Sequence, residues 1–112
     1  MTVTVAVLIP AKIAENTQQT QYTSNGVKTI IDKFTATNFS ASAAVISVNI
    51  VTTAGTAGNA NLITKTKTLQ PTETYTFPEL VGQVLNSGDF ISTLAGTASA
   101  INIRASGRQI TS

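Results

Sequence analysis

The feature that most constrains this chain is a period-two alternation of apolar and polar side chains in several short segments. Residues 44–51 show it most clearly, because Ile46, Val48 and Ile50 alternate with polar residues. Successive side chains of a β-strand point to opposite faces, so this pattern is typical of a half-buried strand. We therefore expect residues 44–51 to form a central strand with one face in the core.

Comparable segments recur along the whole chain and are separated by Gly, Asn, Ser and Pro. Short alternating runs with this punctuation are typical of β-sandwiches and barrels. We expect an all-β, antiparallel, jelly-roll-like β-sandwich of about eight short strands, forming a single domain over residues 1–112. At most one short helical turn is expected, in residues 78–85. The expected strands are residues 2–9, 18–23, 27–38, 44–51, 62–69, 74–77, 90–94 and 100–110.

Two residues interrupt the alternation of their strands. Pro10 has no backbone N–H, so the first strand should either be an edge strand or end there, and residues 1–10 could form an N-terminal arm. Asp32 falls on the same face as Phe34, which predicts a β-bulge near Ile31. The polar segment 18–23 is expected to be another edge strand.

Charged residues make up only 11% of the chain, against about 25% in typical domains. Weak repulsion between copies favours self-association or stable docking, although hydroxyl and amide groups alone would also keep such a surface soluble. The seven cations are spread along the sequence for a net charge of +2, so nucleic-acid binding is not expected. No apolar run is long enough to predict a membrane span.

Catalytic residue types are scarce, because the chain contains no His and no Cys. The commonest general base, the thiol nucleophile and the usual zinc ligands are therefore missing. Among the five acids, Glu73 and Asp89 occupy turn contexts that explain them structurally. We expect no enzymatic activity, no cofactor and no metal site. The loop from Gly55 to Gly58 lacks the ending of a phosphate-binding loop and is expected to be a hairpin loop.

Four residues are candidate partner contacts. Phe39 lies in a polar turn, where it either tucks under the sandwich or is an exposed contact. Lys65 and Lys67 should share one strand face, either as solvated charges or as a docking stripe. An exposed Tyr22 beside amide side chains would favour a sugar-binding platform.

Several strand-and-turn segments share a recognisable pattern. They include the turn Gln-Pro-Thr-Glu-Thr-Tyr at 70–75 and the C-terminal strand, residues 100–110. The other segments are residues 31–38, 63–69, 78–85 and 88–92. Together, these segments resemble small structural proteins of tailed bacteriophages.

The resemblance implies a virion protein of the capsid cement or decoration type, made in the host cytoplasm without a signal peptide. Its partners would be the major capsid protein or other virion proteins, bound through many modest contacts that add by multivalency. A homo-oligomer is expected, either a trimer, as the preferred form, or another cyclic assembly. The two terminal strands could pair with a neighbour. The alternatives are a neck or tail component and a carbohydrate- or receptor-binding module at the tail tip.

Overall fold

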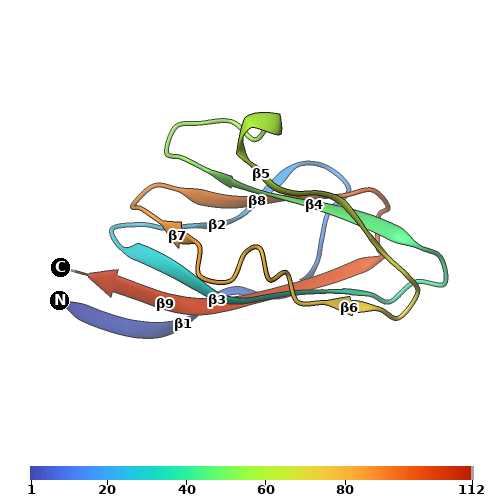
Figure 1. Ribbon diagram of the computed structural model, residues 1–112, viewed down its shortest axis with the longest axis horizontal. Helices are drawn as coiled ribbons and strands as arrows, with labels where there is room; N and C mark the ends of the chain where they lie inside the picture. Colours follow the sequence, from blue (N-terminus) through green and yellow to red (C-terminus); the bar gives the residue numbers. More distant parts are fainter. Residues whose placement is uncertain (112) are drawn as a thin grey trace.

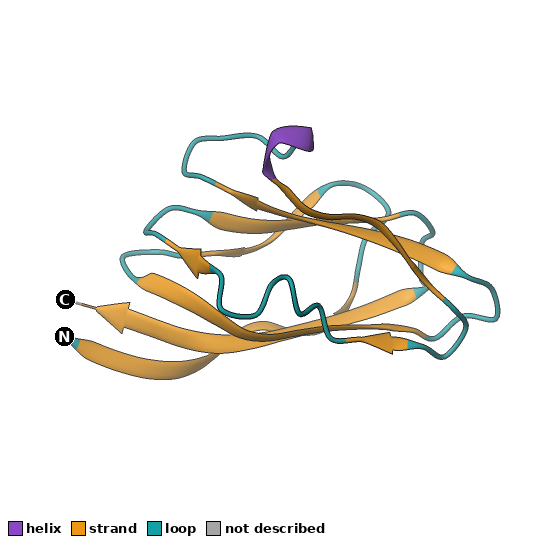
Figure 2. Ribbon diagram, viewed as in Figure 1, coloured by secondary structure: helices purple, strands orange, loops and turns teal. Residues whose placement is uncertain are grey.

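Two antiparallel β-sheets packed face to face make up the computed structural model of the protein, which describes residues 1–111 (Figures 1 and 2). A single turn of 3-10 helix, Asn59–Asn61, is the one helical element in this part of the chain. The first sheet contains, in spatial order, β1 (Thr2–Ile13), β9 (Ile101–Thr111) and β3 (Lys28–Asn38), followed by the short strands β6 (Thr74–Tyr75) and β7 (Val84–Leu85). The second sheet contains β2 (Gln19–Thr23), β8 (Phe90–Ala95), β4 (Ala44–Val51) and β5 (Leu62–Leu69).

The strand pairs are nested in sequence. β4 pairs with β5, β3 with β6 and β7, β2 with β8, and β1 with β9. This order is that of one long antiparallel ribbon rolled into two sheets, which is the jelly-roll arrangement. The expected fold class is therefore confirmed. The described residues form nine strands instead of the expected eight, because two short strands, β6 and β7, both pair with β3.

The core lies between the sheets and is built from the inward side chains of both. Ile46 and Val48 of β4 are fully buried, as the alternation predicts. Phe34 of β3 packs edge-on against Phe77, with ring centroids 5.0 Å apart. Tyr75 also packs edge-to-face against Phe77, with ring centroids 4.7 Å apart. Edge-to-face pairs of this kind add to the stabilisation that comes from burying the rings.

The predicted bulge in β3 is present. The register between β3 and β9 shifts between Ile31 and Lys33. Ile31 and Phe34 are consequently both buried, while Asp32 points to solvent. Gly107 of β9 lies opposite the bulge, where a side chain would overlap the backbone carbonyl of Ile30.

The first strand is an edge strand, as Pro10 predicts, but it does not end there. β1 continues to Ile13 and pairs with β9 over its length, with register shifts between Val7 and Ile9 and between Ile9 and Lys12. Pro10 is tolerated because the outer edge of β1 has no ladder partner to lose. The segment considered as an N-terminal arm, residues 1–10, lies almost entirely in this strand.

The expectation of at most one helical turn is confirmed, but this turn lies within the β4–β5 connection and not in residues 78–85, which could also have held it. Residues 78–83 form turns that fasten onto β3 through two backbone hydrogen bonds, Gly82 N to Ile31 O and Ile31 N to Gln83 O. Gly82 has a positive φ of 86°, which interrupts any helix at this point. The second predicted edge strand is confirmed, because β2 lies at the edge of its sheet.

Replacing Gly107 by Ala is expected to destabilise the protein by about 1–3 kcal/mol, because the added methyl group would overlap the carbonyl of Ile30. Urea denaturation would measure the loss. Gly58→Ala is the matched control, since its Cβ would meet nothing within 4 Å. Equal stability of the two variants would contradict the close approach at the bulge.

Candidate interaction surface

The outer face of the first sheet carries three exposed valines on β1. Val3, Val5 and Val7 are 50%, 81% and 51% exposed. Directly paired residues of antiparallel strands share a face, and Val5 pairs with Arg108, which is exposed. The valines therefore point away from the core, although their spacing alone resembles that of a core strand.

This apolar character extends across the sheet. Arg108 pairs on its other side with Ile30, and Ile30 pairs with Val84, so these side chains form one row with Val5. Ile30 is half-buried and Val84 is 48% exposed. In the next row, Val3 pairs with the half-buried Ile110. We call the set Val3, Val5, Val7, Ile30, Val84 and Ile110 the apolar face.

One ion pair lies within the apolar face, and two exposed lysines, Lys28 and Lys33, lie in the rows on either side of it, paired with Ile110 and Ser106. Arg108 donates from Nε and Nη2 to the carboxylate of Asp32 at 2.8 to 3.2 Å. The hydrogen bonds and charge of Asp32 raise the pKa of Arg108. The fork-like contact neutralises both charges. It leaves the centre of the apolar face without a net charge.

On the outer face of the second sheet, the β4–β5 segment covers the outward polar residues of β4. Asn49 and Ser47 point outward from β4 yet are almost fully buried. Asn49 donates to the carbonyl of Gly58 and to Oδ1 of Asn61, and Ser47 accepts from the backbone of Thr66. These polar groups are already satisfied within the protein and offer little to a ligand.

Tyr22 does not form an exposed platform. Its side chain packs against the core, and its hydroxyl lies 2.7 Å from the hydroxyl of Thr29 and accepts from Gln109 at 2.9 Å. The side chain of the neighbouring Gln21 forms hydrogen bonds with Lys12, Glu15 and Thr93. The arrangement that would favour a sugar site at Tyr22 is therefore absent from the described structure.

Phe39 is neither tucked under the sandwich nor fully exposed. Its side chain is 50% exposed, while its backbone N–H is fixed by the carbonyl of Ala100. It lines a shallow groove on the outer side of the first sheet together with Thr37 and Arg104. This groove is at the end of the sheet opposite to the apolar face.

Lys65 and Lys67 do not form a simple stripe, because the register between β4 and β5 shifts between them. Lys65 is exposed. Lys67 is half-buried, with its ammonium 4.6 Å from the ring centroid of Tyr75. The hydroxyl of Tyr75 donates to Glu79 at 2.9 Å. Desolvation, and then the hydrogen bond to Glu79, raise the pKa of Tyr75.

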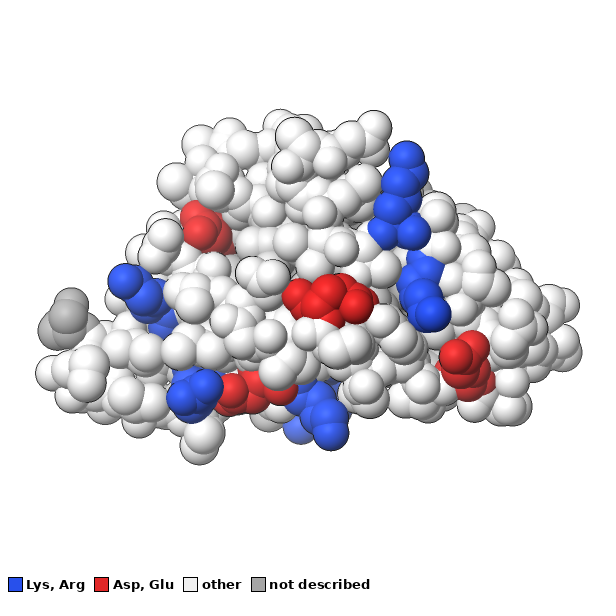
Figure 3. Space-filling view, viewed as in Figure 1, with Lys and Arg blue, Asp and Glu red and all other residues white. Residues whose placement is uncertain are grey.

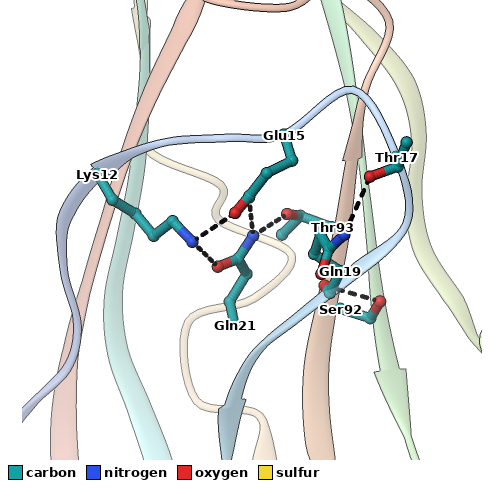
Figure 4. Close-up of polar contacts among 7 residues, drawn as sticks. All are labelled: Lys12, Glu15, Thr17, Gln19, Gln21, Ser92 and Thr93. Carbon is teal, nitrogen blue, oxygen red and sulfur yellow. Dashed lines mark hydrogen bonds and ion pairs between the residues drawn. The ribbon is translucent and has the colours of Figure 1, made fainter.

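A polar network links the two sheets near β2 (Figure 4). Lys12 of β1 donates to Glu15 at 2.9 Å and to Gln21 of β2 at 2.7 Å. Gln21 in turn donates to Glu15 and to Thr93 of β8. The hydrogen bonds from Lys12 and Gln21 lower the pKa of Glu15 from 4.5 to about 2.

The other acids also have structural partners. Asp89 accepts from the backbone N–H groups of Thr53 and Asn86, and Glu73 accepts from that of Gln70. The contacts with Asn86 and Gln70 are the turn contacts that the sequence predicts, whereas the contact with Thr53 is long-range. Over residues 1–111, no group of three or more acids is close enough to hold a metal ion. On the face shown in Figure 3, charged side chains lie in small groups separated by uncharged surface.

No helix within the described residues is long and apolar enough to cross a membrane. Comparison with protein-family models, with curated proteins and with solved structures finds no match.

The apolar face was not among the predicted contact residues. Of the four candidates, the structure leaves Phe39 and Lys65 accessible and engages Tyr22 and Lys67 in internal contacts. The available signal was an expected edge strand with three alternating valines. Each strand of a sandwich faces the core on one side only, so a strand with apolar residues on both faces leaves one set of them in solvent.

The network in Figure 4 makes the stability of the protein depend on pH through Glu15. The folded pKa lies below the ordinary value, so this stabilisation is present above pH 4.5 and is lost as the pH falls towards 2. The unfolding free energy of wild type relative to Glu15→Gln should therefore fall between pH 5 and pH 2. Because Glu15 is 41% exposed, the effect should also weaken in high salt. A difference independent of pH in urea titrations would contradict the assignment.

Proposed function

We propose that this protein is a structural virion protein of a tailed bacteriophage, which binds the capsid as a cement or decoration protein. The observation that carries the proposal is the apolar face, an exposed surface with a neutralised ion pair at its centre. Contiguous exposed apolar surface is uncommon on monomers and marks protein–protein contacts. The resemblance of its strand-and-turn segments to phage proteins supplies the setting.

The fold supports a role in assembly. Jelly rolls are frequent in viral shells, and the nested strand pairs provide a stiff platform for a docking surface. A low total charge suits a component present in many copies, since neighbouring copies repel each other weakly. Each copy would contribute a modest contact to the capsid, and many copies would add.

A carbohydrate-binding role has less support than docking to protein. Sugar platforms use exposed aromatic rings, but Tyr22 is engaged by Thr29 and Gln109. Tyr75 is covered on one side by Lys67 and packs on Phe77. A neck or tail position uses the same docking physics and is separated from the capsid position by the first experiment below.

Cryo-electron microscopy of the parent particle tests the proposal directly. We expect many copies on the capsid shell, with the apolar face towards the capsid protein. A few copies confined to the neck or tail would contradict the cement role and favour an adaptor.

A binding assay tests the docking face. Particles lacking the chain would be mixed with the purified protein and sedimented. Val84→Asp, which places a charge on the apolar face, should weaken co-sedimentation at least about tenfold, because the carboxylate would be buried unpaired. Thr68→Asp is the matched control, since Thr68 is exposed on β5 of the other sheet. Equal loss in both variants would exclude the apolar face as the docking site.

A further inference from the structure

The outer edge of β1 has two unlike halves. Between Ile9 and Lys12 the strand contains Pro10 and an irregular register. Proline and bulges are the devices by which edge strands avoid pairing with other chains. From Thr2 to Val7, by contrast, the register against β9 is unbroken. This half of the edge has no protecting feature.

The unprotected half also contains no charge. The segment from Thr2 to Ala11 has no Lys, Arg, Asp or Glu. An edge strand of a monomer usually has such residues, often Lys, to discourage pairing. On the neighbouring strand β9, the charge that faces this segment is Arg108, which pairs with Val5 and is neutralised by Asp32. Two copies could therefore approach along this edge without repulsion between like charges.

The same segment is complementary to itself. In an antiparallel pair centred on Val5, Val5 faces its own copy and Val3 faces Val7. On the other side of the sheet, Thr4 faces Ala6. Directly opposed side chains share a face, so the valines of both copies would meet on the outer face. The paired stretch would end at Leu8, just before Pro10 and the first bulge.

We infer that a second copy of this chain pairs with β1 across a two-fold axis at Val5, which joins the two first sheets into one continuous sheet. Such a contact is isologous, because each copy supplies the same residues. It uses the backbone edge together with the cross-strand valines. It also brings two apolar faces side by side on one surface. The inferred assembly is a dimer, in place of the trimer expected from the resemblance.

The dimer is tested on the isolated full-length chain, so its failure is distinguishable from failure of capsid binding. Sedimentation velocity over a concentration series should show a monomer–dimer equilibrium. Val5→Lys should weaken dimerisation at least about tenfold, because two ammonium groups would oppose each other across the axis. Val81→Lys is the control, since Val81 is 50% exposed and lies outside β1. A monomeric or trimeric wild type, or a dimer unaffected by Val5→Lys, would overturn the inference.

Cysteine cross-linking tests the register independently, since the chain has no native Cys. Residues opposed across antiparallel strands have Cα atoms about 4.5–5.5 Å apart, which suits a disulfide. Val5→Cys should cross-link to itself under mild oxidation, whereas Val3→Cys alone should not, because its copies would lie about 13 Å apart. A mixture of Val3→Cys and Val7→Cys should cross-link. Efficient self-linking of Val3→Cys would contradict the proposed axis.

Discussion

The pairing of β3 with β9 across the bulge at Ile31 is the interaction on which the rest of the structure depends. One extra residue in β3 reverses the faces of all side chains that follow it. The shift directs Phe34 into the core and Asp32 outward to Arg108. It requires Gly107 in the facing strand, because a larger residue would meet the carbonyl of Ile30. A local irregularity thus sets both the aromatic core and the neutral centre of the apolar face.

The parts of the fold that follow from local sequence pattern were predictable. The alternation in residues 44–51 predicts a central strand. Asp32 breaks the alternation because it falls on the same face as Phe34, and this predicts a bulge. Turn residues delimit nearly all the strands. The pattern does not determine which of the two alternating sets of side chains in an edge strand faces the core. Val3, Val5 and Val7 repeat as a core strand would, but the shift before Ile9 buries Leu8 and Ile9 and leaves the valines in solvent.

At several positions the exposure of a side chain is decided by long-range packing. Tyr22 has polar neighbours in the sequence, yet its hydroxyl accepts a hydrogen bond from Gln109, 87 residues further along the chain. Asn49 alternates as an outward residue and is nevertheless buried by the loop that holds Asn61. The bulge in β5 places the ammonium group of Lys67 over the ring of Tyr75. In each case the exposure of the side chain depends on residues that are distant in the sequence, and a local periodic pattern contains no information about them.

The position of β9 has a consequence for how the protein is made. This strand comes last in the chain but lies between β1 and β3, and it is the one described strand that pairs with β1. During synthesis, β1 therefore emerges from the ribosome long before its partner exists. Its valine-rich segment therefore has no intramolecular partner strand until β9 has also emerged, so the first sheet closes only after all the other described strands have been made. Truncating the C-terminus by one strand would remove the middle of a sheet instead of shortening its edge.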